Sequence, residues 1–191
     1  MLKWMFSDEA EVMKAASDVI KEWGAPSVLV NNAGIYSRDT ALDIPYVLWQ
    51  KTLMVNLGGT FLCSRAFAPG MMEKGGGAIV NLASSVAFTP TPKGAHYAAS
   101  KAGILSLTKT LAKEWAPSIR VNAVSPGVTD TDQPREGVSS DEELYSHGKQ
   151  IPLGRIGHPA DVAEAVFFLS GPNAAYITGA NIHINGGALM V

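Results

Sequence analysis

The chain has 191 residues, with 15 lysines and arginines against 17 aspartates and glutamates, and a formal net charge of −2. Hydrophobic residues make up 47% of the sequence and charged residues 17%, which excludes the composition of a disordered chain. The near-neutral balance argues against a nucleic-acid partner, because binding to phosphates needs a basic surface. The single cysteine, Cys63, excludes an internal disulfide, and no cysteine–histidine cluster indicates a metal site.

The length predicts one domain over residues 1–191. No apolar run approaches the roughly 18 residues that a membrane span requires, and the N-terminus lacks the pattern of a signal peptide. We therefore expect a cytoplasmic protein with no membrane contact.

Short apolar runs alternate with helical patterns along the chain. Ser7 and Asp8 predict a helix start and Gly24 a helix end, and Pro45 is typical of the first turn of a second helix that runs to about Met72. The expected strands are 27–31, 78–82, 119–124 and 181–184, and the expected further helices are 97–115 and 159–169. Residues 128–152 have little regular pattern apart from a helical turn near 141–145.

This alternation predicts the α/β class, as a doubly wound parallel sheet with helices on both faces. In such sheets ligands bind beyond the carboxyl ends of the strands. Small and polar residues gather at three predicted ends, namely Asn31-Asn32-Ala33-Gly34, Ala83-Ser84-Ser85 and Ser125-Pro126-Gly127. One such cluster is typical of any turn, but three at successive strand ends favour a binding site.

Tyr97 and Lys101 lie four residues apart, which places both side chains on one face of a helix. An ammonium beside a phenol favours the phenolate, so the pair predicts a lowered pKa for Tyr97. A tyrosine with such a pKa can exchange a proton near neutral pH. A solvated helix face is the alternative interpretation of the pair alone.

These motifs together resemble the short-chain dehydrogenase/reductase family, particularly its 3-oxoacyl-carrier-protein reductase and sugar or polyol dehydrogenase members. The residues that carry the resemblance appear in the family's order: Asn31-Asn32-Ala33-Gly34, Asn56, a serine at a strand end, Tyr97-x-x-x-Lys101, and Pro126-Gly127-Val128-Thr129-Asp130-Thr131. The resemblance implies a Rossmann-like fold and an oxidoreductase that interconverts a secondary alcohol and a ketone with NAD or NADP.

The resemblance also implies a role for each matching residue. Tyr97 would be the general acid/base, Lys101 would lower its pKa and bind the nicotinamide ribose, and Asn56 would anchor a water that links Lys101 to solvent. The family's spacing from Asn81 and Tyr97 selects Ser84 over Ser85 as the serine that holds the substrate oxygen, which leaves Ser85 to pack or cap. The implied cofactor contacts are Asn32, Ala33, Gly34, Tyr97, Lys101, Pro126, Gly127, Val128 and Thr131.

Residues 128–152 would form a lid over a small-molecule substrate. His96 adjoins Tyr97, but we expect its side chain to point away from the catalytic face. Family members commonly form homotetramers through their two long helices and the C-terminal strand, and we expect the same of this chain.

The sequence lacks the glycine-rich βαβ part that binds phosphate in this family. Two βα units are absent from the pattern, so the strand at 28–31 would be an open sheet edge, which is an association hazard. We expect either that the sequence is an N-terminally truncated record of a longer enzyme or that this edge pairs with another chain. The second functional hypothesis is a catalytically silent remnant that acts only as a binding or assembly protein. An epimerase or dehydratase is a weaker third hypothesis, because such relatives have a larger C-terminal domain.

Overall fold

The structure is a computed structural model that describes residues 8–137 and 139–191. Its strands are β1 (Val28–Asn31), β2 (Gly77–Leu82), β3 (Ile119–Pro126) and β4 (Asn181–Ile184). Its α-helices are α1 (Glu9–Trp23), α2 (Tyr46–Leu53), α3 (Gly59–Glu73), α4 (Ala95–Trp115), α5 (Asp132–Arg135), α6 (Asp141–Gly148) and α7 (Pro159–Ser170). The shorter turns are the π-helix η1 (Met54–Gly58) and the 3₁₀ turns η2 (Ser85–Ala87) and η3 (Pro172–Ala174).

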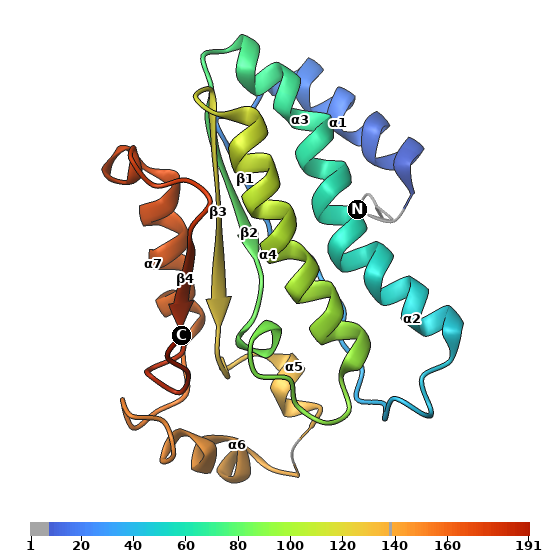
Figure 1. Cartoon of the computed structure of the whole chain (residues 1–191), viewed down its shortest axis with the longest axis vertical. Coiled ribbons are helices and arrows are strands. Elements are labelled where there is room, and N and C mark those ends of the chain that lie inside the picture. The colour runs from blue at the N-terminus through green and yellow to red at the C-terminus, as the bar shows by residue number, and fades with distance from the viewer. Residues whose placement is uncertain (1–7, 138) are drawn as a thin grey trace.

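The four described strands form one parallel sheet in the order β1-β2-β3-β4. Figure 1 shows α1, α3 and α4 on one side of this sheet and α7 on the other. The alternation of side chains along β2 explains this arrangement: Ile79 packs in the core with α1, α3 and α4, whereas Val80 packs in a second core with Leu169 of α7. The predicted doubly wound parallel sheet is confirmed.

The ends of the helices follow from local hydrogen bonding. The side chain of Asp8 accepts a hydrogen bond from the Glu11 N–H at 3.0 Å, and Gly24 ends α1 with a φ of 82°. His158 begins α7: its side chain accepts from the Ala160 N–H, while Asp161 accepts from the His158 N–H. The predicted start at Asp8 and end at Gly24 are confirmed, whereas Ser7 lies outside the described residues.

The expected single helix from about residue 45 to 72 is wrong in one respect. A π-helical turn, η1, separates α2 from α3. Hydrophobic periodicity does not reveal one wider turn inside a long helix, and such turns are frequent at functional sites. Asn56 lies in this turn, and its carbonyl accepts a hydrogen bond from the Thr60 hydroxyl at 2.7 Å.

β1 lies at the edge of the described sheet, as the sequence predicts. Val28 and Val30 remain 38% and 41% exposed, because no described helix covers their face of β1. Together with α7 they line an open apolar groove of about 680 Å³. The edge strand therefore leaves apolar surface in contact with solvent.

Strand β2 is buried on both faces, and its core side chains should contribute strongly to stability. Ile79 is fully buried in the core, so Ile79→Ala should lower the free energy of unfolding by about 2–5 kcal/mol through lost burial and the cavity left behind. Leu42 is 98% exposed, and Leu42→Ala should change it by less than about 0.5 kcal/mol. Urea denaturation measures both, and equal losses would contradict this account of the core.

Candidate active site

The candidate site lies beyond the carboxyl ends of the strands, where α5 and α6 close the same end of the molecule (Figure 1). Because all four strands are parallel, the segments after Asn31, Leu82 and Pro126 emerge at this one edge. The three polar clusters of the sequence therefore share one end of the sheet.

Helix α4 brings Tyr97 and Lys101 to this edge. Tyr97 lies in the first turn of α4 and Lys101 one turn later, and Lys101 is only 4% exposed. The ammonium Nζ of Lys101 donates a hydrogen bond to the carbonyl of Leu82 at 2.6 Å and lies 5.5 Å from the centroid of the Tyr97 ring. The side chain of Ser84, two residues beyond Leu82, faces the Tyr97 hydroxyl and acts to lower its pKa.

The predicted lowering of the Tyr97 pKa is wrong for the free chain. Burial raises the pKa of Tyr97, and this effect exceeds the opposing effect of the hydrogen bonds from Gln133 and Ser84. The reason is geometric: Lys101 lies over the ring and bonds to a main-chain carbonyl, so its charge is not held at the hydroxyl. Tyr97 is consequently a protonated phenol at neutral pH.

Burial acts in the opposite direction on the lysine. It lowers the pKa of Lys101 from 10.5 to about 8, because a buried ammonium loses hydration. The group therefore titrates close to neutral pH, which suits a side chain next to a proton donor.

Ser84 and Ser85 differ in what they contact. Ser84 follows β2, and its Oγ accepts a hydrogen bond from the Val86 N–H at 3.4 Å as the N-cap of η2, while it also faces the Tyr97 hydroxyl. Ser85 is the first residue of η2 itself. The capping role expected of Ser85 therefore belongs to Ser84, which reaches Tyr97 as well.

Asn56 is fully buried in η1 and holds the loop that follows β1. Its Oδ1 accepts from the Ile35 N–H at 2.8 Å, and its Nδ2 donates to the Ile35 carbonyl and to Ser100 Oγ, each at 3.0 Å. Both N–H groups of the amide are thus used within the protein. The expected bond from Asn56 to a water stays a prediction.

The expected cofactor contacts surround this cluster. Asn32, Ala33 and Gly34 are exposed directly after β1. A Cβ added at Gly34 would lie 3.3 Å from Asn56 Oδ1 and 3.7 Å from Lys101 Nζ. The glycine therefore keeps open the space beside the ammonium.

The contacts expected after β3 lie on the neighbouring strand end. Pro126 ends β3, and the Gly127 N–H donates to the Ile184 carbonyl at 2.9 Å. The carbonyl of Val128 accepts from the Gly157 N–H at 2.9 Å, and Thr131 is exposed at the start of α5. These residues form the base of the 128–152 segment.

The 128–152 segment is more ordered than the sequence suggests, since it contains α5 and α6. Arg135 joins the two helices: its guanidinium lies 2.5 Å from an Asp130 carboxylate oxygen, and its Nε donates to Asp141 at 3.1 Å. The Tyr145 hydroxyl donates to the other Asp130 oxygen at 3.0 Å. The expected helical turn near 141–145 is confirmed as part of α6, whereas α5 was not expected.

Two side chains at the site were not expected there. Gln133 of α5 faces the Tyr97 hydroxyl and acts to lower its pKa, and the Tyr36 ring lies against the Tyr97 ring. His96 is fully buried, and its Nε2 lies 2.8 Å from Ser37 Oγ, so it points away from Tyr97 toward the loop after β1, as expected. No sequence motif marks Gln133 or Tyr36, because each reaches the site from a loop or a short helix.

The residues present fit the ribose of a nicotinamide nucleotide. An ammonium has three N–H donors, and Lys101 uses one of them on the Leu82 carbonyl. The space that Gly34 leaves open lies beside the same ammonium. A sugar hydroxyl placed there would satisfy a buried donor that otherwise costs free energy.

Residues 8–137 and 139–191 contain neither a metal-binding cluster nor a membrane-spanning helix. No group of three or more histidine, cysteine, aspartate or glutamate side chains in these ranges is arranged to hold a metal ion. No helix within them has the length and apolarity needed to cross a membrane.

The fold and the site define the class: a doubly wound α/β protein with a tyrosine–lysine pair at the carboxyl ends of its strands. A family model described as enoyl-(acyl carrier protein) reductase matches residues 6–188. The chain is 42% identical over 180 residues to the 3-oxoacyl-(acyl-carrier-protein) reductase FabG of Aquifex aeolicus, a match that covers 94% of this chain and 72% of that protein. The Vibrio cholerae protein of the same name is 40% identical over 181 residues, with the same two coverages.

A solved structure agrees with these relatives. The ligand-free aldohexose dehydrogenase (AldT) of Thermoplasma acidophilum matches with a TM-score of 0.92 and 33% sequence identity, over 96% of this chain and 75% of that one. The chain therefore belongs to the short-chain dehydrogenase/reductase family, and its resemblance is to oxidoreductases.

The lowered pKa of Lys101 makes stability depend on pH. Between about pH 8 and 10.5 the unfolded chain keeps the Lys101 proton and the folded chain releases it, so the free energy of unfolding should rise with pH. Relative to Lys101→Met, the rise should total at most about 3–4 kcal/mol. Chemical denaturation across this range measures the difference, with the exposed Lys109→Met on the same helix as the matched control. A wild-type curve parallel to that of Lys101→Met would refute the burial effect.

Proposed function

We propose that this protein interconverts a secondary alcohol and a ketone with NAD or NADP, and that Tyr97 is its general acid/base. The observation that carries the proposal is the cluster of Tyr97, Ser84 and Lys101. The serine side chain faces the tyrosine hydroxyl, and the lysine is buried one helical turn away. Two hydroxyl donors beside a buried ammonium suit a carbonyl oxygen that becomes negatively charged as it is reduced.

The protonated state of Tyr97 suits the reduction step, in which the general acid must give up a proton. Because burial raises its pKa, the phenol holds its proton until a stronger base is formed. The oxygen of a carbonyl under reduction is such a base, and Tyr97 would then transfer its proton to that oxygen. Ser84 would hold the same oxygen, so that the proton is passed over a short distance.

Lys101 would act on both the sugar and the tyrosine. Its remaining N–H groups would bind the ribose, and its charge would stabilise the phenolate that is left when Tyr97 loses its proton. The bound nicotinamide supplies or accepts the hydride. Asn32, Ala33, Gly34, Pro126, Gly127, Val128 and Thr131 would hold the nucleotide along the carboxyl edge of the sheet.

The names of the relatives indicate the type of reaction. A 3-oxoacyl reductase and an aldohexose dehydrogenase both carry names of carbonyl–alcohol chemistry. Their substrates differ in shape, so we propose the reaction type and not one compound. The 128–152 segment would cover the substrate, with Gln133 beside the reacting oxygen.

Removing the acid/base should abolish turnover without unfolding the chain. Tyr97→Phe should lower kcat by about 10²–10⁴-fold, the usual contribution of a positioned proton donor. Nicotinamide absorbance with a panel of 3-oxoacyl and sugar substrates measures this. Tyr46→Phe, at an exposed position on α2, is the matched control. Retained activity in Tyr97→Phe would exclude Tyr97 as the acid/base.

Cofactor binding separates the enzyme from the silent remnant. Titration with NADH and with NADPH, followed by nicotinamide fluorescence, should give saturable binding of at least one. Lys101→Met should weaken that binding, because it removes the donors beside Gly34. Saturable binding and its loss would support the enzyme, whereas no binding of either nucleotide would favour a protein that keeps only the fold.

A further inference from the structure

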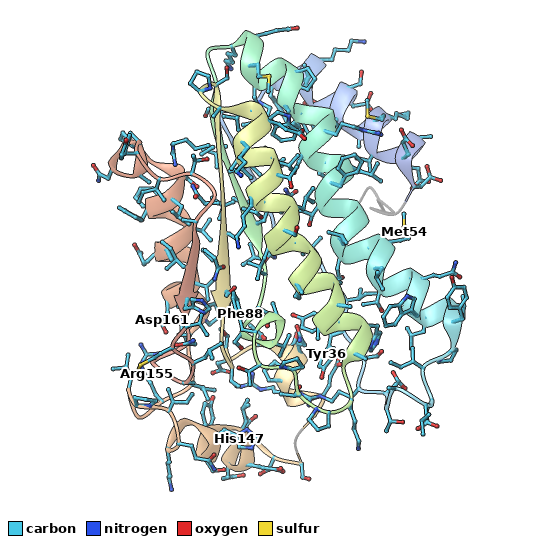
Figure 2. The ribbon with its side chains drawn as sticks, viewed as in Figure 1. Tyr36, Met54, Phe88, His147, Arg155 and Asp161 are labelled. Carbon is cyan, nitrogen blue, oxygen red and sulfur yellow. The ribbon has the colours of Figure 1, made fainter. Side chains whose placement is uncertain are left out.

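Tyr36 contacts Tyr97 from the loop between β1 and α2. The centroids of the two rings are 4.6 Å apart, and the ring planes are inclined by 45°. Tilted aromatic pairs at this distance are attractive beyond their buried area. Figure 2 shows Tyr36 near α5 and the N-terminal end of α4, where Tyr97 lies.

The ring of Tyr36 is held from the segment that precedes α4. Its hydroxyl donates to the carbonyl of Lys93 at 3.1 Å, and Lys93 has a φ of 62°, the left-handed region that residues other than glycine rarely adopt. At the next position, a Cβ on Gly94 would lie 3.2 Å from Cε2 and 3.3 Å from the hydroxyl oxygen of Tyr36. The turn before α4 therefore packs closely against the Tyr36 ring. The guanidinium of Arg38 lies 5.3 Å from the centroid of the same ring, in a cation–π contact.

The backbone on both sides of Tyr36 is fixed as well. Ile35 is bonded through its N–H and its carbonyl to Asn56 of η1. Ser37 is bonded through its hydroxyl to the buried His96, which directly precedes Tyr97 on α4. The main chain that carries Tyr36 is thus held from η1 and α4, and its side chain is held by the bond to the Lys93 carbonyl.

We propose that Tyr36 is a positioning residue that fixes the ring of Tyr97, and with it the direction of the phenol hydroxyl toward Ser84. A phenol that rotates out of line loses its short path to the substrate oxygen, and small misplacements of reacting groups cost large factors in rate. The catalytic importance of this contact rests on the proposed function, whereas the positioning itself is a property of the free chain.

The same contact bears on the titration of Tyr97. Tyr36 from the loop and Lys101 from α4 are the titratable side chains that face its ring, while Ser84 and Gln133 are the polar ones. Burial is the main cause of the raised Tyr97 pKa, and Tyr36 adds to it. Replacing Tyr36 with a smaller side chain should admit water and lower that pKa.

The test uses Tyr36→Leu, Tyr36→Phe and, as the control, Tyr176→Leu at a fully exposed position. The chain has five tyrosines, so labelling them with carbon-13 at Cζ gives few signals, and Tyr97→Phe assigns the one of interest. Titration by NMR then reports the Tyr97 pKa without cofactor. Steady-state assays give kcat and KM separately.

Tyr36→Leu should lower kcat by about 10- to 100-fold with little change in KM, and should lower the Tyr97 pKa. Tyr36→Phe keeps the ring and should retain most of kcat, and Tyr176→Leu should behave as the wild type. If Tyr36→Leu does not fold, Gly94→Ala displaces the same ring, because its Cβ would lie 3.2 Å from Tyr36 Cε2, and it should also lower kcat with little change in KM and shift the Tyr97 titration.

Unchanged kcat and an unchanged Tyr97 titration in the variant that folds would overturn the proposal, as would equal losses in Tyr176→Leu. A wild-type chain without oxidoreductase activity would refute the proposed function instead. In that case the shift of the Tyr97 signal alone supports or refutes the positioning by Tyr36.

Discussion

The side-chain amide of Asn56 is the constraint on which the site depends. It pairs with both main-chain polar groups of Ile35, as a neighbouring strand would, and reaches Ser100 of α4 with its remaining N–H. Because this amide is fully buried, breaking any of these bonds would leave a polar group without a partner at a cost of about 1–3 kcal/mol. The loop after β1 is therefore fixed to two helices, and the small residue Gly34 is fixed with it.

A second polar network fixes the strand ends below this loop. Asn31 of β1 donates to Asn81 of β2 at 2.8 Å and to Ser64 of α3 at 2.9 Å, while Asn81 donates to Thr108 of α4 at 2.9 Å. These groups lie in the apolar interior between the sheet and the helices. A fully hydrogen-bonded polar network there favours one arrangement of the core, whereas a network with a missing partner costs free energy of folding. The network fixes the register of β1 and β2 at the position where the site begins.

Regular features were predictable from the sequence, and contacts across the fold were not. The parallel sheet, the start of α1 at Asp8 and the shared helix face of Tyr97 and Lys101 all follow from local spacing. The direction of the Tyr97 pKa did not follow, because spacing gives the neighbour of a group but not its burial. The Arg135 contacts with Asp130 and Asp141 likewise depend on how two short helices meet, which no periodicity encodes.

Helix α4 links the site to the hydrophobic core, and this link affects how the protein would be inactivated on unfolding. Its first turns carry Tyr97, Ser100 and Lys101, and later turns of the same helix bury Ile104 and Leu111 in two of the hydrophobic clusters. Tyr97 and Lys101 thus belong to the same helix as part of the core. Heat or denaturant should therefore displace these two side chains only when the core packing of α4 is lost as well, in the cooperative unfolding of the domain.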